Sequence, residues 1–294
     1  MRAKASLVVI LAVAILGAAL AVLHSQQASR ALGKPIEKSA IKSDEPTRGG
    51  HTATVVSKHL GKGAFKGVQF PTLSALGLDL GDRPLVEQLA ELEVQARTGN
   101  PDIGYALAMK LRECKQLDSQ YSDLQNSLDR KLDGNSDVLT RHADALDKQY
   151  EQCKGLSAMT LQEYGQWVEL AARRGSIAAQ VSYPTINWEA LEDSGRSLDT
   201  EAIEAYKSNT LSFLTSAADQ GSVDALSQLA MTYQDGIVVP RDPIAAYAYE
   251  WAINQTGLVL ATPKLLEQWE AQMTPEQILV GRKQGEQIHQ RCCR

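Results

Sequence analysis

Residues 211–221 read Leu-Ser-Phe-Leu-Thr-Ser-Ala-Ala-Asp-Gln-Gly, and residues 222–236 read Ser-Val-Asp-Ala-Leu-Ser-Gln-Leu-Ala-Met-Thr-Tyr-Gln-Asp-Gly. Gly221 can adopt the positive φ that ends a helix, and the Ser222 hydroxyl can accept a free backbone N–H of the next helix. The apolar residues that follow have helical spacing, at Ala225, Leu226, Leu229, Ala230 and Tyr233. This stretch therefore predicts the end of one helix and the whole of a second, which Gly236 closes.

A third helix is predicted after Ile-Val-Val-Pro-Arg-Asp-Pro at 237–243. Asp242 can cap its first turn, and Pro243 suits the first helical position because proline lacks the N–H that would have no partner there. Its inner face consists of Ala245, Ala246, Tyr249, Ala252 and Ile253. The alanines are small enough for this helix to approach the preceding one closely.

Together these residues resemble a Sel1-like repeat, a relative of the tetratricopeptide repeat. The positions that carry the resemblance are Ala217, Ala218, Gly221, Ala225, Leu229, Ala230, Tyr233, Gly236, Val239, Asp242, Ala245 and Ala246, with Trp251 near the expected aromatic residue. The resemblance implies an all-α fold, a right-handed α-solenoid built from Sel1-like and tetratricopeptide-like helix pairs. It assigns these residues a structural role.

A second repeat precedes the first. Ala171 and Gly175 align with Ala217 and Gly221, which gives a period of 46 residues and predicts another helix pair. Pro184 predicts that the helix beginning after Ser176 ends early, with 184–199 as an inserted loop. A weaker third copy is expected at Ala96, Gly99, Ala106, Leu107 and Ala108.

Two further segments are expected to be helical. Residues 118–152 are highly charged with helical periodicity, which favours a helical hairpin with Gly134 at its turn. At the other end of the chain, two closing helices are predicted, the second starting at Thr274-Pro275 with Ile278, Leu279 and Ile288 facing inward.

The N-terminus predicts export. Arg2 and Lys4 precede an uncharged apolar run at 7–23, which is near the lower limit of about 17 residues for a helix that crosses a bilayer. An uncleaved inner-membrane anchor and a signal peptide cleaved near Ala19-Leu20-Ala21 both fit this pattern. In either case the body is expected in the periplasm.

Three regions follow from this pattern: a signal anchor or signal peptide at 1–24, a mostly disordered linker at 25–83, and a helical repeat domain at 84–294. Residues 51–83 leave a choice, because they fit either a linker or an extended segment that docks on the body. Ser39 and Lys42 match the Ser-x-x-Lys pattern of penicillin-recognising enzymes, but chance explains the match better in a polar linker.

The four cysteines also fit an oxidising compartment. Cys114 and Cys153 are expected to form a disulfide between helix ends, which would stabilise the fold by about 4 kcal/mol in the chain-entropy model; two unpaired thiols are the alternative. A bond between the adjacent Cys292 and Cys293 would be strained, so bonding to other partners or free thiols is expected as readily. The spacing of the cysteines and histidines does not resemble a zinc site.

Charge and motifs exclude several classes of function. Residues 1–81 carry 10 basic and 4 acidic side chains, and the rest of the chain 20 basic and 31 acidic ones, so the body is acidic. Nucleic-acid binding needs a basic surface and is not expected. No phosphate loop, dinucleotide fingerprint or hydrolase motif occurs, so we expect no cofactor, no metal and no catalysis.

The resemblance to Sel1-like repeats implies a protein–protein adaptor, which we expect in the cell envelope, with a partner protein bound on the concave face of the helix pairs. An immunity protein that neutralises a toxic enzyme in the periplasm is the alternative, and a β-lactamase-like enzyme is a weaker one. Trp167, Trp188, Trp251 and Trp269 either line a binding groove or pack between helices.

Overall fold

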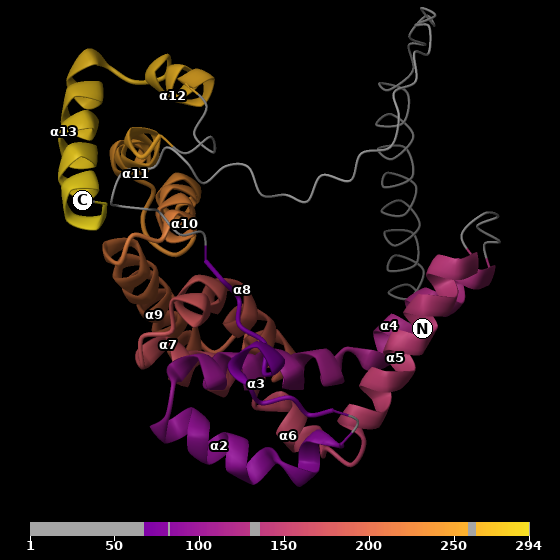
Figure 1. The fold of residues 1–294 in the computed structure, drawn as a ribbon. Coiled ribbons are helices and arrows are strands. Elements are labelled where there is room, and N and C mark those ends of the chain that lie inside the picture. Colours follow the sequence, from indigo (N-terminus) through magenta and orange to yellow (C-terminus); the bar gives the residue numbers. More distant parts are fainter. Residues whose placement is uncertain (1–67, 82, 130–135, 258–262, 294) are drawn as a thin grey trace, which may run out of the picture. The chain divides into compact units, whose positions relative to one another are not determined.

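A computed structural model describes residues 68–81, 83–129, 136–257 and 263–293, all within the unit His59–Arg294. These residues form α-helices and two short 3₁₀ helices, and no strand occurs among them (Figure 1). The all-α prediction is confirmed. The first elements are the 3₁₀ helices η1 (Ser74–Leu76) and η2 (Leu85–Glu87), followed by α2 (Leu89–Thr98), α3 (Pro101–Lys115), α4 (Leu117–Asp129), α5 (Ser136–Cys153), α6 (Ala158–Gln162), α7 (Tyr164–Arg173), α8 (Ile177–Asp193), α9 (Thr200–Asp219), α10 (Val223–Asp235), α11 (Pro243–Gln255), α12 (Pro263–Glu270) and α13 (Pro275–Cys292).

Most helices from α7 to α11 pack on the next helix in the chain, whereas α3 packs on α7 across the intervening α4, α5 and α6. From α2 the contacts lead to α3, then α7, α8, α9, α10 and α11, and α13 covers α11. One apolar core lies mainly among α2, α3, α7 and α8, and a second among α9, α10, α11 and α13. Ala96, Ala171, Ala217 and Ala225 are fully buried. Because their side chains are small, the helices of both cores can approach one another closely.

The local signals at 217–243 are confirmed. Gly221 has a φ of 86°, and the Ser222 hydroxyl accepts the Ala225 N–H at 3.2 Å. Gly236 ends α10 with a φ of 72°, and Asp242 accepts the N–H groups of Ile244 and Ala245, each at 3.0 Å. The end of α9, both ends of α10 and the start of α11 therefore lie where the capping residues predicted.

The prediction that Pro184 ends its helix is wrong. α8 continues through Pro184 to Asp193, and residues 184–193 are helical rather than an inserted loop. A proline inside a helix removes one backbone hydrogen bond. Tyr183, Ile186 and Leu191, on either side of Pro184, are buried, and the apolar surface that they remove from water favours the continuous helix.

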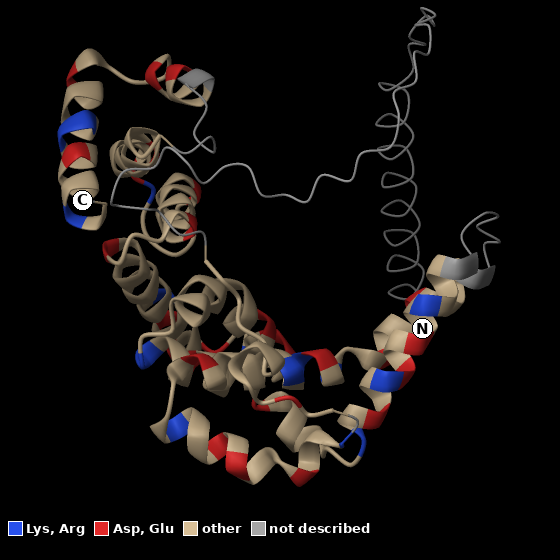
Figure 2. Ribbon diagram, viewed as in Figure 1, with Lys and Arg blue, Asp and Glu red and all other residues tan. Residues whose placement is uncertain are grey.

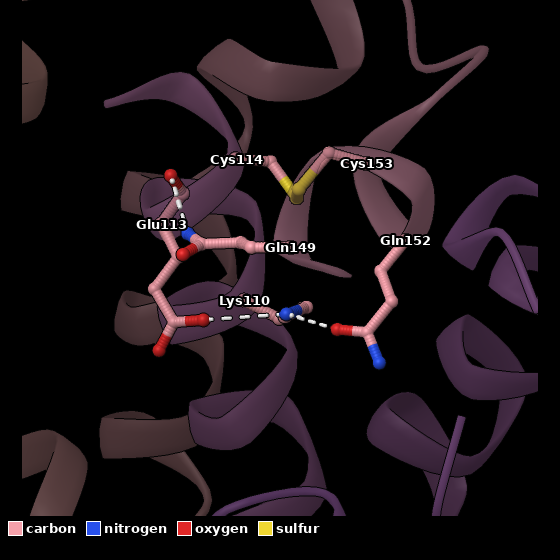
Figure 3. Close-up of a disulfide and its surroundings, with 6 residues drawn as sticks. All are labelled: Lys110, Glu113, Cys114, Gln149, Gln152 and Cys153. Carbon is pink, nitrogen blue, oxygen red and sulfur yellow. Dashed lines mark hydrogen bonds and ion pairs between the residues drawn. A yellow bond between two sulfur atoms is a disulfide. The ribbon is translucent and has the colours of Figure 1, made fainter. Parts of the chain in front are cut away.

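The expected hairpin is formed by α4 and α5, which have their own small core of Leu117, Leu124 and Leu146. Its expected turn at Gly134 lies outside the described residues. The structure joins Cys114 at the end of α3 to Cys153 at the end of α5, with Cα atoms 5.3 Å apart (Figure 3).

Beside this disulfide, Lys110 of α3 donates to Gln152 of α5 at 2.8 Å and pairs with Glu113 at 3.4 Å (Figure 3). Gln149 donates to the backbone oxygen of Glu113 at 3.2 Å. The base of the hairpin is thus held to α3 by both covalent and polar contacts.

Helix α13 begins with the expected Thr274 cap, which forms a full capping box with Gln277. Ile288 is buried as predicted, but the prediction that Leu279 faces inward is wrong, because 71% of Leu279 is exposed. The inner face uses Gly281 and Gly285 instead. A Cβ atom on Gly285 would lie 2.7 Å from the Ala248 carbonyl oxygen, so the glycine permits a closer approach of α13 to α11 than any other residue.

Residues Val68–Gly81, which we call the strap, pack on the helices. Leu73 and Leu80 are buried in the first core, and the half-buried Val68 contacts both cores. Of the two interpretations left open for 51–83, docking on the body therefore describes this part of the segment.

The predicted membrane anchor at 7–23 and the Ser39 and Lys42 pair lie outside the described residues. Within the part of the chain that is described, no helix is both long and apolar enough to cross a bilayer. The structure pairs Cys292 with Cys293, so the four cysteines form two disulfides.

Candidate partner-binding groove

A groove with a volume of about 520 Å³ opens among α6, α7, α8 and α9, and we call it the α7–α9 groove. Its lining residues come from these helices and from the turn before α9: Met159, Gln162, Glu163, Gly165, Gln166, Glu169, Arg173, Tyr183, Asn187, Ala190, Leu191, Ser194, Arg196, Ala202, Ala205, Tyr206 and Asn209. α7 and α9 both pack on α8, and α8 contributes Tyr183, Asn187, Ala190 and Leu191 to the lining.

Capping groups fix the ends of the helices around this groove. The Ser176 hydroxyl accepts the Ala179 N–H at 3.2 Å where α8 begins. The Asp199 carboxylate accepts the Glu201 N–H at 3.0 Å where α9 begins. Such caps satisfy backbone donors that would otherwise lack partners, and so they set where each helix starts.

Close packing of α7 on α8 depends on Gly165. A Cβ atom at this position would lie 2.4 Å from the Ala190 Cβ, which is too close for any other residue without movement. Asn187 donates to the Gly165 carbonyl oxygen at 3.4 Å across the same contact. Gly165, which lines the groove, therefore permits the close approach of α7 to α8.

A polar network lies across the groove. Arg173 pairs with Glu169 at 2.7 Å and donates to the Asn209 side-chain oxygen at 3.2 Å. Asn209 in turn donates to the Tyr183 hydroxyl at 3.2 Å. These contacts join α7, α8 and α9, so the network holds the three walls in register.

Aromatic side chains pack together at the groove, where Tyr183 is buried and Tyr206 is half-buried. The rings of Tyr183 and Tyr206 stack with centroids 6.1 Å apart, and Trp188 lies 5.5 Å from Tyr206. The Tyr206 hydroxyl donates to the Pro184 carbonyl oxygen at 2.9 Å. Flat rings beside amides and ion pairs form a surface of the kind that protein interfaces use, where aromatic residues and arginine are enriched.

Burial shifts the pKa of both tyrosines that line the groove. Burial raises the pKa of Tyr183 to about 12, even though the hydrogen bond from Asn209 acts in the opposite direction. Burial also raises the pKa of Tyr206. Both phenols are therefore neutral near pH 7 and can donate hydrogen bonds, but neither is activated as a nucleophile.

The four tryptophans mostly pack between helices. Trp167 is buried with the Arg97 guanidinium 4.6 Å above its ring, and Trp251 and Trp269 are half-buried. Trp188 borders the tyrosine pair, although it does not line the groove itself. Of the two interpretations of these residues, packing is the one that the structure favours.

The residues of the repeat pattern support the fold rather than the groove. Ala171, Ala217, Ala225, Leu229 and Ala230 are fully buried. Gly175 ends α7 with a φ of 94°. Tyr233 stacks on Tyr249 at 5.8 Å, while Ala245 and Trp251 are half-buried in α11. No member of this set lines the α7–α9 groove.

Acidic and basic residues are interspersed along the described helices (Figure 2). Among residues 68–81, 83–129, 136–257 and 263–293, no group of three or more His, Cys, Asp and Glu side chains could hold a metal ion.

The sequence did not predict the α7–α9 groove, because its lining residues come together only through packing between helices. The aromatic content of 183–206 was the one available signal.

Comparison with known protein families, with curated proteins and with solved structures finds no match to this chain.

Proposed function

We propose that this protein is a non-catalytic interaction module of the cell envelope that binds a partner protein through its packed helices. The α7–α9 groove carries this proposal, because it combines the rings of Tyr183 and Tyr206 with paired charges and amide groups, and neither tyrosine is activated. The resemblance of 211–254 to a Sel1-like repeat supports it, since helix pairs of that type form an α-solenoid with a concave binding face.

The proposed location is the periplasm, with residues 7–23 as an inner-membrane anchor. The Cys114–Cys153 disulfide supports an oxidising compartment, because such bonds persist in exported proteins and are rare in the reducing cytosol. The acidic body and the interspersed charges of the described helices support a protein partner rather than nucleic acid (Figure 2).

The test is capture of envelope proteins by the full chain and by a variant with an obstructed groove. Gln166→Arg with Ala205→Arg adds two long, charged side chains at exposed groove positions. Ser208→Arg is the control, because Ser208 is exposed on α9 and does not line the groove. We expect at least one protein whose recovery falls about tenfold with the groove variant and is unchanged with the control, which corresponds to about 1.4 kcal/mol.

Equal recovery of every captured protein by both variants would contradict the proposal for this groove. The identity of a groove-dependent partner then separates the roles: a hydrolase or nuclease would favour the immunity alternative, and a structural or secretion protein the adaptor. Turnover of a β-lactam by the purified chain would contradict the non-catalytic part.

A further inference from the structure

The strap contains only the short 3₁₀ helix η1, and it contacts both apolar cores. At its first residue the Val68 N–H donates to the Asp224 carboxylate of α10 at 3.0 Å, between residues 156 positions apart. Two residues later, the Phe70 ring lies 6.2 Å from the Tyr105 ring of α3. The N-terminal part of the strap therefore contacts two helices of different cores (Figure 1).

The rest of the strap is held by two buried leucines, by the half-buried Leu76 and Leu78, and by one backbone contact. Leu73 and Leu80 are 6% and 5% exposed, whereas the residues next to each of them are exposed or half-buried. Gln152 of α5 donates to the Gly81 carbonyl oxygen at 2.7 Å. Spaced apolar anchors with main-chain hydrogen bonds are the usual features of a bound peptide.

The strap does not fill the surface on which it lies. A cavity of about 330 Å³ remains between it and α3, lined by Phe70, Leu73 and Leu80 on one side and by Tyr105, Met109 and Lys110 on the other. Phe70 is 54% exposed, so this end of the strap is only partly covered. A segment with larger side chains could occupy the same surface more completely.

We propose that the surface under the strap is a peptide-binding site, and that an extended segment of a partner protein displaces the strap from it. The chemistry of the partner segment follows from the strap itself. Val68–Leu80 carries one charged side chain, Asp79, and its buried anchors are leucines. The partner segment is therefore nearly uncharged, extended at its start and anchored by two large aliphatic residues.

This inference rests on the proposed function in that the ligand is a protein, but it concerns a different surface from the α7–α9 groove. Because the strap is part of the same chain, its effective concentration at the site is of the order of millimolar. A free segment must compete with it, so the site is mostly closed until a partner of higher affinity arrives.

The experiment measures binding of a fluorescent synthetic peptide with the sequence of residues 68–81 to the full chain by anisotropy. In Leu73→Asp with Leu80→Asp, the chain's own strap loses both anchors while the peptide keeps them. We expect this variant to bind the peptide at least tenfold more tightly than the unchanged chain. Ser74→Asp with Ala75→Asp adds the same charge at exposed strap positions and should bind like the unchanged chain.

Circular dichroism shows whether the leucine variant is folded. If it is folded and binds no more tightly than the unchanged chain, the proposal is wrong. If it does not fold, Val68→Pro with Phe70→Ala takes its place, since it removes the N–H donor and a half-exposed ring without changing the buried leucines. Binding by that variant less than threefold tighter than by the unchanged chain would equally overturn the proposal. Neither result depends on capture through the α7–α9 groove, so the two proposals can fail separately.

Discussion

The Tyr164 hydroxyl of α7 donates a hydrogen bond to the Asp193 carboxylate in the last turn of α8. Lys115 of α3 forms an ion pair with the same carboxylate, so three helices meet at one side chain. One turn earlier on α8, Glu189 accepts from Arg112 at 2.8 Å and from Gln116 at 2.9 Å. The C-terminal half of α8 is thus fastened to α3 and α7 by two carboxylates.

Through Asp193, the free energy of unfolding should depend on pH. Burial acts to raise its pKa, but hydrogen bonds from Lys115 and Tyr164 outweigh burial and hold the pKa below its usual value. A carboxyl group with a depressed folded-state pKa contributes stability above its unfolded pKa of about 3.9, and this contribution is lost as the pH falls through the folded pKa. We expect Asp193→Asn to lower the free energy of unfolding by about 0.5–1 kcal/mol at pH 7, because the group is partly exposed.

Below pH 4 the difference between Asp193→Asn and the unchanged chain should shrink, which urea unfolding at pH 7 and pH 3 can measure. Glu192→Gln is the control, since Glu192 is exposed beside Asp193. A difference that stays constant with pH would contradict the stabilising role of the ionised carboxylate.

The Cys114–Cys153 disulfide should be a major source of stability. Closing a loop between cysteines 39 positions apart lowers the conformational entropy of the unfolded chain. The chain-entropy model gives about 4 kcal/mol as an upper value for the resulting stabilisation. We expect Cys114→Ser with Cys153→Ser to lower the melting temperature in calorimetry by several degrees, because each kcal/mol lost from a large domain lowers it by about 2–4 °C. Cys292→Ser with Cys293→Ser controls for loss of the other disulfide, and an equal effect of both pairs would contradict the prediction.

Gly285 should not tolerate a side chain. Its Cβ would lie 2.7 Å from the Ala248 carbonyl oxygen and 2.8 Å from the Trp251 ring. We expect Gly285→Ala to destabilise the chain by about 1–3 kcal/mol, because α13 would have to move off α11. Gln284→Ala, at an exposed position of the same helix, should change the free energy of unfolding by less than about 0.5 kcal/mol in urea unfolding. A Gly285→Ala variant as stable as this control would show that the helix contact is looser than described.

Replacing Pro184 should stabilise the chain. The helix already continues through this position, so Pro184→Ala would restore the missing N–H donor without a change of fold. We expect a gain of about 1–3 kcal/mol, in line with the difference in helix propensity between the two residues. The measurement is thermal unfolding followed by circular dichroism, and a lower melting temperature would count against the prediction.

Capping residues made the repeat helices predictable, because each signal acts within a few residues of its target: Gly221, Ser222 and Asp242 all take the roles expected of them. The predictions at Pro184 and Leu279 were wrong because packing between helices decides both positions. It favours the continuation of α8 through Pro184, and it turns Gly281 and Gly285 of α13, rather than Leu279, toward α11. The docking of Val68 could not be predicted, since its partner Asp224 lies 156 positions away and the strap has no periodic pattern. The α7–α9 groove likewise exists only once α6, α7, α8 and α9 have packed.

The bond between Cys114 and Cys153 also bears on how damage to the hairpin would be detected. A protease that cuts the backbone anywhere between these two residues leaves both pieces covalently joined. The nicked molecule would migrate at full size on a gel without reductant and separate into two fragments only after reduction. An intact band under oxidising conditions is therefore no proof that α4 and α5 are uncut.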